Sequence, residues 1–295
     1  MMALLRLAAL GVVAGVIFVI GLIFWPVGTD PAPIELAGDV NRGAYLARAS
    51  GCIACHTDIA GGGAPLAGGA PLETSFGAFH PPNLTTDPEA GIGAWSVEDF
   101  AKAVRQGVSP EGEPYFPTFT YPFYASFSDQ DIADLWAAFQ TVPAVEEPAP
   151  GHEVAFPFDQ RWGMKLWRAA FLGPPNTEPV EGRSAAWNRG KKLVEGASHC
   201  AACHTARNFA GARVSGAAFA GNDDLPGGDK APSILPEQLI ERGWTVANLA
   251  FALRTGVMPD GDAFGGSMGE VVQGGTAFLS EEDLTAMATY VLDAD

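Results

Sequence analysis

A five-residue motif that occurs twice constrains this chain more than any other feature. Cys-X-X-Cys-His stands at 52–56 and again at 200–204, and the two copies contain all four cysteines of the 295-residue chain. Four cysteines are too few for a scaffold built on disulfides. Two thiols on one helical turn can form thioethers with the vinyl groups of a single haem, and the next histidine then binds the iron. The motifs therefore predict two covalently bound haem c groups, held by Cys52, Cys55 and His56 and by Cys200, Cys203 and His204.

Two other kinds of cysteine site fit the spacing less well. Paired Cys-X-X-Cys zinc ligands normally stand about 15–20 residues apart, whereas Cys55 and Cys200 are 145 positions apart. A thioredoxin-like redox pair needs a βαβ context, which the sequence does not show. Haem attachment is the interpretation that accounts for both motifs.

The two motifs occupy equivalent points of an internal duplication. Residues 41–57 match 188–205, residues 95–113 match 244–262 at an offset of 149, and residues 127–139 match 279–291 at an offset of 152. Each copy has the same order: cysteine motif, loop, helix, loop and terminal helix. We expect a membrane anchor or signal over 1–30, a first cytochrome c domain over 40–144, a linker with a short helix over 145–185, and a second cytochrome c domain over 186–295.

Capping residues mark the helices of each copy. Ser96 and Thr245 precede apolar residues at helical spacing, and Gly107 and Gly256 follow them as stop signals. The last helix of each copy begins after a serine with an aspartate three positions on, a weak capping-box pair, at Ser128 with Asp131 and at Ser280 with Asp283. No stretch shows the sustained alternation typical of strands. The sequence predicts an all-α fold whose short helices leave part of the core to the haem.

The linker contains one stretch of helical pattern, 158–172. Trp162, Leu166 and Phe171 can line one face of that helix. One interpretation is a connecting helix packed on both domains, and the other is a helix lying on a membrane surface.

Residues 7–25 form an uncharged apolar run of 19, which as a helix reaches about 28 Å and just spans a bilayer. A cleaved signal peptide usually has a shorter apolar region followed by a small-residue cleavage site, and no persuasive site stands between Trp25 and Pro33. A buried core helix is the third interpretation. We expect a single-pass anchor preceded by Arg6, which by the positive-inside rule leaves the body in the periplasm of a bacterial inner membrane.

The second haem has a methionine available as sixth ligand. Met268 stands in a glycine-rich loop 64 residues after His204, and such a segment can bring a thioether onto the iron and raise its reduction potential. Met258, in the segment Val-Met-Pro-Asp-Gly, is predicted to be a turn residue. Met268 is therefore the expected ligand.

The first haem has no methionine in its own copy. Offsets of 149 to 152 map Met268 onto residues 116–119, Phe-Pro-Thr-Phe, and no methionine occurs between His56 and Met164. The sixth ligand stays open between His80, His152, Met164 and no protein side chain.

The positions of His80 and His199 bear on the choice of this sixth ligand. His80 stands two residues before Pro82, in a segment expected on the proximal side of the haem. His199, directly before Cys200, is expected at the surface rather than as a ligand.

Charge excludes one class of partner. The chain has 17 Lys and Arg against 34 Asp and Glu, a net charge of −17, which argues against nucleic-acid binding. An acidic surface suits a lysine-rich protein partner through electrostatic steering, and it also suits a protein adapted to salt.

Seven segments carry a resemblance to a known family: GCIACHT, PPNLTTDPEAGIGAWS, GVSPEGEPYFP, FPFDQRW, WNRG, HCAACHTARN and GGSMGEVVQ. With them, about residues 40–295 resemble the di-haem c-type cytochromes that serve as electron-transfer subunits of bacterial periplasmic and membrane-bound dehydrogenases, such as the nicotinate, alcohol and gluconate types. The resemblance implies that Pro82 and Pro232 carbonyls accept hydrogen bonds from His56 and His204. Family members commonly carry a methionine where this chain has Phe127, and an apolar residue in place of His80.

The expected function is that of an electron carrier rather than an enzyme. It would pass single electrons from a partner dehydrogenase to a soluble cytochrome or terminal oxidase, with the redox chemistry supplied by the haems. The alternative is a di-haem redox enzyme of thiosulfate or peroxide type that uses an open haem 1. A haem-based gas sensor would need an output domain, which the sequence does not encode.

Overall fold

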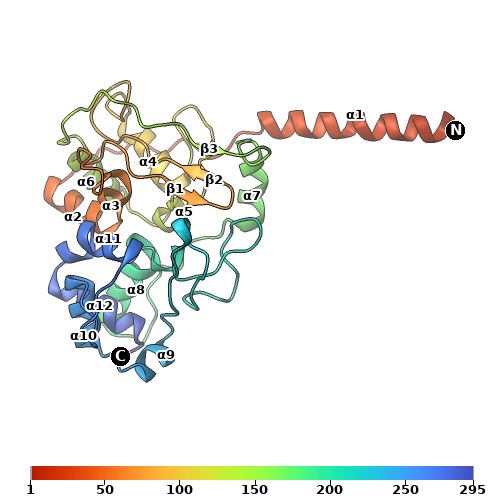
Figure 1. Cartoon of the computed structure of the whole chain (residues 1–295). Coiled ribbons are helices and arrows are strands. Elements are labelled where there is room, and N and C mark those ends of the chain that lie inside the picture. Colours follow the sequence, from red (N-terminus) through yellow and green to blue (C-terminus); the bar gives the residue numbers. More distant parts are fainter. Residues whose placement is uncertain (1, 295) are drawn as a thin grey trace.

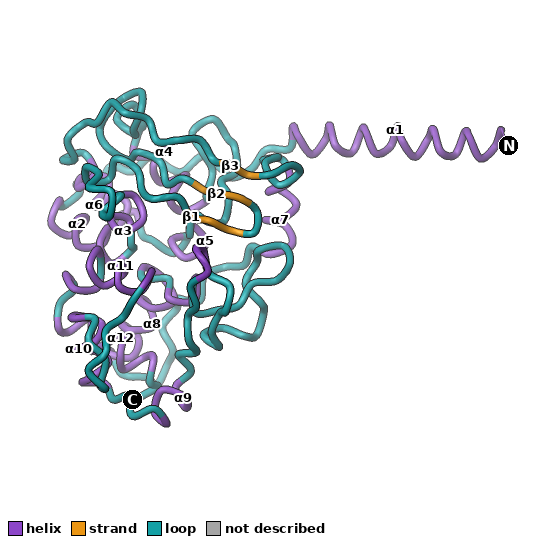
Figure 2. Tube along the Cα trace, in the orientation of Figure 1, coloured by secondary structure: helices purple, strands orange, loops and turns teal. Residues whose placement is uncertain are grey.

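The computed structural model describes residues 2–294 and consists of a mostly helical body from which one long helix projects (Figure 1). That helix, α1 (Met2–Phe24), contains an apolar stretch, Leu5–Phe24, that is long enough to cross a membrane and is not buried against the body. By length and composition the stretch fits either a membrane span or a signal sequence. Loops make up much of the body, as Figure 2 shows.

The first half of the body is built on a crossing of two helices. Its helices are α2 (Val40–Ala49), α3 (Cys52–His56), α4 (Val97–Gln106), α5 (Tyr121–Tyr124) and α6 (Asp129–Phe139). Where α2 crosses α6, a β-carbon on Gly43 would overlap the carbonyl oxygen of Asp134. Only glycine allows the two backbones this approach.

The second half repeats that crossing. Its helices are α8 (Ala185–Lys192), the π-helical turn η1 (Leu193–Ala197), the short 3₁₀ turns η2 (Cys200–Ala202), η3 (Pro226–Gly228) and η4 (Thr276–Phe278), and α9 (Pro236–Glu241), α10 (Val246–Thr255), α11 (Gly266–Gly274) and α12 (Glu281–Val291). A β-carbon on Gly190 of α8 would overlap the carbonyl oxygen of Ala286 in α12. Gly190 thus allows the close approach of α8 and α12, as Gly43 allows that of α2 and α6.

The caps read from the sequence are confirmed, with one difference. The side chain of each cap residue, Ser96, Ser128 or Thr245, accepts a hydrogen bond from the backbone N–H three residues on. The side-chain oxygen of that later residue accepts one from the backbone N–H of the cap residue. Gly107 and Gly256 end α4 and α10 in the left-handed conformation. Ser280 caps α12 in the same way, but the carboxylate of Asp283 binds other groups instead of completing the box.

The prediction of a purely α-helical chain is wrong in one detail, because the described residues contain a small antiparallel sheet. Its strands are β1 (Leu72–Thr74), β2 (Gly77–Phe79) and β3 (Glu153–Val154), in the order β1-β2-β3. Strands of two or three residues are too short to produce a visible alternation in the sequence. Since β3 belongs to the linker, the sheet ties the start of the linker to the first half.

One apolar core extends through both halves. Phe100, Ile132 and Leu135 of the first half belong to the same cluster of buried side chains as Leu284 and Met287 of the second. Polar contacts also cross between the halves: the Tyr45 hydroxyl donates to Asp283 at 2.5 Å, and the Arg48 guanidinium lies 3.6 Å from the centre of the Phe278 ring. The halves therefore pack as one unit.

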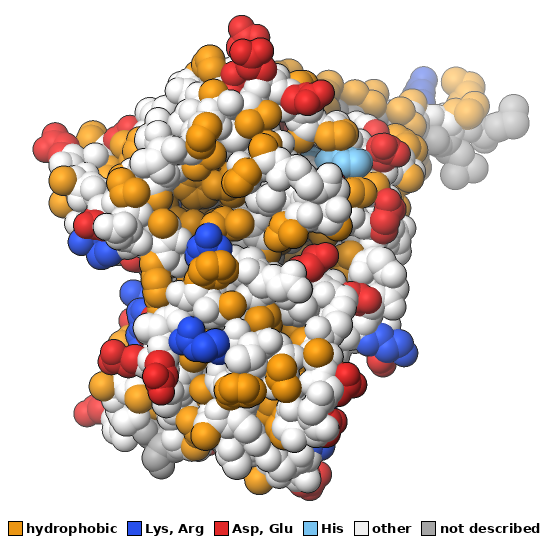
Figure 3. All heavy atoms as spheres, turned by 60° about the vertical axis from the view of Figure 1, so that its left-hand side comes forward, with side chains coloured by type: hydrophobic (Ala, Val, Ile, Leu, Met, Phe, Trp, Pro, Cys, Tyr) orange, Lys and Arg blue, Asp and Glu red, His pale blue; other side chains and the backbone are white. Residues whose placement is uncertain are grey.

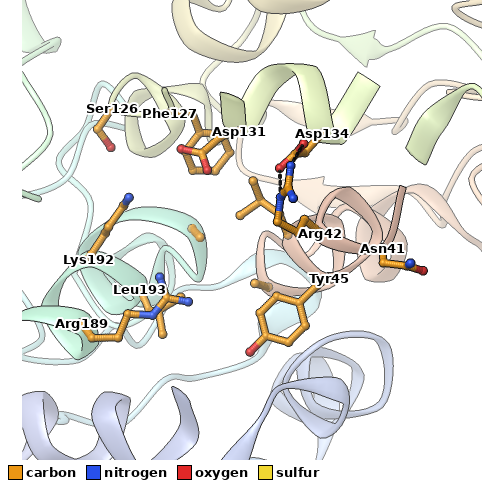
Figure 4. A pocket seen from close by; sticks show the side chains of 13 residues that line it. Asn41, Arg42, Tyr45, Ser126, Phe127, Asp131, Asp134, Arg189, Lys192 and Leu193 are labelled. Carbon is orange, nitrogen blue, oxygen red and sulfur yellow. Dashed lines mark hydrogen bonds and ion pairs between the residues drawn. The ribbon is translucent and has the colours of Figure 1, made fainter. Parts of the chain in front are cut away.

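A cleft of about 410 Å³ opens between α2, α6 and α8 (Figure 4). On its wall Arg42 binds the buried Asp134 through two hydrogen bonds, Nε to Oδ2 at 2.7 Å and Nη2 to Oδ1 at 2.8 Å. The hydrogen bonds from Arg42 lower the pKa of Asp134 to about 2. The residues around this cleft include none of the cysteines or histidines of the two motifs.

The linker helix is α7 (Gly163–Phe171), shorter than the stretch 158–172 read from the sequence. It contacts both halves, since Arg168 donates to the carbonyl of Gln106 at 2.7 Å and the Trp167 indole donates to that of Ala210 at 2.8 Å. The interpretation as a connecting helix packed on both halves is confirmed by these contacts.

Candidate functional site

The first cysteine motif forms a helix of its own. Gly51 has φ 67°, the left-handed conformation that glycine adopts without strain, and it turns the chain from α2 into α3. One turn of α3 then carries Cys52, Cys55 and His56. The buried Tyr124 hydroxyl donates to the carbonyl of Ser50 at 2.7 Å and fastens the start of this turn.

The ring of His56 is oriented by the backbone. Its Nδ1 donates to the carbonyl oxygen of Pro82 at 2.8 Å, which leaves Nε2 as the ring nitrogen available to a metal. Asn83, next to Pro82, donates from its side chain to the carbonyls of Val145 and Glu147 and so holds that segment in place. Desolvation lowers the pKa of His56, which favours the neutral ring that metals bind.

The second motif shows the same arrangement with a tighter turn. Cys200–Ala202 form a 3₁₀ turn, and His199, at the position of Gly51, has φ 38°. Nδ1 of His204 donates to the carbonyl oxygen of Pro232 at 2.7 Å, and desolvation again lowers the pKa of the ring. Both histidine–proline hydrogen bonds implied by the family resemblance are therefore present.

These residues fit haem c in both places. All four cysteines are free thiols rather than disulfides, and each pair stands within one turn of the chain beside a histidine whose Nδ1 is already engaged. A hydrogen bond from the second ring nitrogen to a carbonyl sets the tautomer and orientation of a metal-binding imidazole.

The two motifs pack on one apolar core, since Cys52 of the first and Cys200 of the second belong to the same cluster of side chains. Desolvation by the surrounding protein, followed by the charges of Cys203 and Glu270, raises the pKa of the Cys55 thiol to about 11. Gly274 of α11 lies so close to α3 that a β-carbon on it would come within 2.8 Å of the Ala54 β-carbon, between the two cysteines of the first motif. The second half thus packs directly on the first motif.

Met268 lies on a helix rather than in the glycine-rich loop that the sequence indicates. It stands in the first turn of α11, half-buried against the apolar core. Asp229, from a separate loop, accepts hydrogen bonds from the backbone and hydroxyl of Ser267 and stabilises that turn. A contact across 38 residues cannot be read from local sequence. Met258 lies in a turn, as expected, with its backbone N–H bonded to the carbonyl of Asp262.

The duplication narrows the position in the first half that corresponds to Met268. The bridge between Val108 and Pro114 has its equivalent, at an offset of 149, in the bridge between Val257 and Ala263. The equivalent caps Ser128 and Ser280 then stand at an offset of 152. Met268 lies between these two points, and it corresponds to Phe119 at the first offset and to Phe116 at the second.

Phe119 is half-buried among the rings of Tyr115, Tyr121 and Tyr124. Phe127, by contrast, is buried in the core, 5.2 Å from the ring of Tyr124.

The other candidate ligands of haem 1 have different surroundings. The backbone of His80 donates to Nδ1 of His152 at 3.1 Å, and the His152 ring packs on Phe79 and Phe116. Because His80 directly precedes the Pro81–Pro82 segment behind the His56 ring, this cluster lies on the proximal side. Met164 lies in the first turn of α7. These contacts favour structural roles.

His199 is not the surface residue that the sequence suggests. Its ring is half-buried between the halves, 5.9 Å from that of Phe123 and 5.8 Å from that of Tyr124, and its Nδ1 donates to the carbonyl of Ala197 at 2.9 Å. Its position opposite Gly51 explains the burial, because a glycine leaves room for the ring.

Comparison with known proteins gives consistent matches. The family model for cytochrome c matches residues 40–139. A diheme cytochrome c-type protein of Cereibacter sphaeroides is 40% identical over 271 residues, 90% of each chain. A nicotinate dehydrogenase subunit of Pseudomonas putida is 36% identical over 86% of this chain and 21% of its own length. The cytochrome c subunit of the quinone alcohol dehydrogenase of Gluconobacter oxydans is 37% identical over 85% of this chain and 54% of its own. The chain spans about half or less of these last two relatives.

Proposed function

Because the chain belongs to the family of diheme c-type cytochromes, which includes cytochrome subunits of bacterial dehydrogenases, we propose that it carries single electrons from a partner dehydrogenase to a soluble cytochrome or terminal oxidase. The observation that supports this most is the repeated site: two cysteine pairs, each beside a histidine held by a proline carbonyl. Each iron, when bound, supplies the ability to take up and release one electron.

The residues of this chain would attach, orient and shield the two groups. Residues 40–144 would form one cytochrome c domain, with Cys52 and Cys55 as thioether partners and His56 as axial ligand. Residues 186–295 would form the other, with Cys200, Cys203 and His204 in these roles and Met268 as the sixth ligand. The contact of Gly274 with Ala54 supports a short distance between the groups, which suits transfer from one to the other.

The proposed location of the protein is a membrane. Helix α1 would anchor it in the bacterial inner membrane, with the body in the periplasm. In Figure 3 acidic side chains lie mostly around the outline of one face, while Lys and Arg side chains stand nearer its middle. The acidic rim and the net charge of −17 fit a lysine-rich acceptor. Since the relatives are named as cytochrome subunits, the alternative of a thiosulfate- or peroxide-type enzyme is not favoured.

The test is electron exchange with a soluble, lysine-rich cytochrome c. We expect the reduced protein to be oxidised in a second-order reaction whose rate falls by about tenfold or more between low and high salt, because salt screens the attraction. Ferricyanide, an anion, is the control and should react faster as salt rises.

Absence of exchange with the cytochrome would contradict the carrier function. So would sustained turnover of peroxide or thiosulfate by the protein alone, which is the outcome expected of the enzyme.

A further inference from the structure

The linker helix α7 lies where α1 leaves the body. The Lys165 ammonium donates to the carbonyls of Ile23 at 2.7 Å and Trp25 at 2.6 Å, two of the groups that the end of α1 leaves without helical partners. In Figure 1, α7 runs across the direction of α1, at the side of the body from which α1 projects. A helix placed in this way lies parallel to the plane of any bilayer that α1 crosses.

The outer side of α7 is apolar. Leu166 is 46% exposed, and Ala169 and Ala170 are exposed on the same side. Phe171, 43% exposed, ends the helix with its ring 5.7 Å from that of Trp167. Leu166, Ala169 and Ala170 follow the i, i+3, i+4 spacing of one helical face. The opposite side of α7 contacts the protein through Trp167 and Arg168.

Exposed aromatic side chains also stand in two loops: the loop that leads from β3 into α7, and the loop whose Ala210 carbonyl accepts the hydrogen bond from Trp167. Phe156 is 80% exposed, Phe158 is 49% exposed and Phe209 is 95% exposed. The Phe158 ring lies 5.0 Å from that of Phe76, and Phe76 in turn lies against Gly211 in the loop that carries Phe209. We call the five exposed side chains the α7 face: Phe156, Phe158, Leu166, Phe171 and Phe209.

The charge around this surface differs from that of the rest of the chain. Residues 153–177, which carry four of the five side chains of the α7 face, contain three basic and two acidic residues, a net charge of +1 in a protein whose net charge is −17. The basic residues are Arg161, Lys165 and Arg168. A basic, aromatic-rich helix is attracted to anionic lipid headgroups, whereas the rest of this acidic body is repelled by them.

We propose that the α7 face lies on the lipid bilayer in which α1 is inserted, with its aromatic side chains about 5–10 Å deep in the headgroup boundary. The inference rests on the proposed anchoring of α1 and adds a second attachment. Hydrogen bonds from Thr29 to Gln106 and from Ile34 to Glu98 already hold the segment after α1 on the first half. With α1 and the α7 face both engaged, the body keeps one orientation to the membrane. The side of the body that carries α10 then faces the periplasm (Figure 1).

The proposal can be tested with the full-length holoprotein in nanodiscs that contain anionic lipid. In three single variants, Leu166→Cys, Phe251→Cys and Val13→Cys, the new thiol carries a spin label, because haem attachment occupies the native cysteines. Phe251, 55% exposed on α10, is the matched aqueous control, and Val13 reports insertion of α1. Collisions of each label with oxygen, which concentrates in lipid, and with a water-soluble nickel chelate are then measured.

We expect the label at 166 to show a several-fold higher ratio of oxygen to nickel collisions than the label at 251. A lipid-like value at 13 with a water-like value at 166 would overturn the inference while leaving the anchor intact. A water-like value at 13 would overturn both. Shielding of the label at 166 from oxygen and nickel alike would mean that protein covers this face, and it would equally overturn the proposal.

Discussion

At the scale of single residues, the two halves differ most where a sixth ligand is expected. At the offset of 149, Met268 of α11 corresponds to Phe119, a ring packed among tyrosines. A thioether raises the reduction potential of a haem iron, whereas a phenyl ring offers the iron no donor atom. The halves should therefore hold haems of different potential.

Substitutions at these two positions should shift the two haem midpoint potentials in opposite directions. We expect Met268→Leu to lower the higher midpoint potential by an amount on the order of 100 mV, a small part of the ~0.8 V that axial ligands span, and Phe119→Met to raise the lower one. Spectroelectrochemical titration measures both, with Met258→Leu as the control because Met258 lies in a turn. Unchanged potentials in Met268→Leu would remove Met268 from the set of ligands.

At the scale of elements, each half depends on a crossing of two helices at a glycine. Gly43 and Gly190 stand in the same Asn-Arg-Gly triplet of the duplication and meet the backbones of α6 and α12. The triplet is visible in the sequence, but the reason for its glycine is not, since the partner helix lies about 95 residues further along the chain.

Gly190→Ala should be destabilising for this reason. The added methyl group would force α8 away from the carbonyl of Ala286, and such overpacking costs about 1–3 kcal/mol. We expect a clear fall in Tm by differential scanning calorimetry. Gly163→Ala is the matched control, because a β-carbon at Gly163 of α7 meets nothing within 4 Å. Equal Tm values for the two variants would refute the tight crossing.

At the scale of the whole molecule, the halves share one apolar core and meet at the first cysteine motif. Because the helices are short and the loops long, we expect the stability of this core to depend on the haems attached at the two motifs. Loss of one group should then affect more than its own half.

Removing the second attachment tests that dependence. We expect Cys200→Ala combined with Cys203→Ala to leave one covalent haem per chain and to lower the helical circular dichroism signal and the Tm, because an apolar centre is lost from the second half. Cys52→Ala with Cys55→Ala is the corresponding variant of the first half. Full helix content in both double variants would show that the fold forms without the haems.

The sequence by itself determined the chemistry and the family. Haem attachment, the caps of α4, α6 and α10 and the linker helix are local patterns, in which the residues that interact stand within a few positions of one another. Only the tertiary structure decided what depends on distant partners: the sheet closed by β3, the first turn of α11 stabilised by Asp229, and the burial of His199. The physical reason is that these features arise where segments far apart in the chain pack together, and local sequence carries no record of which segments meet.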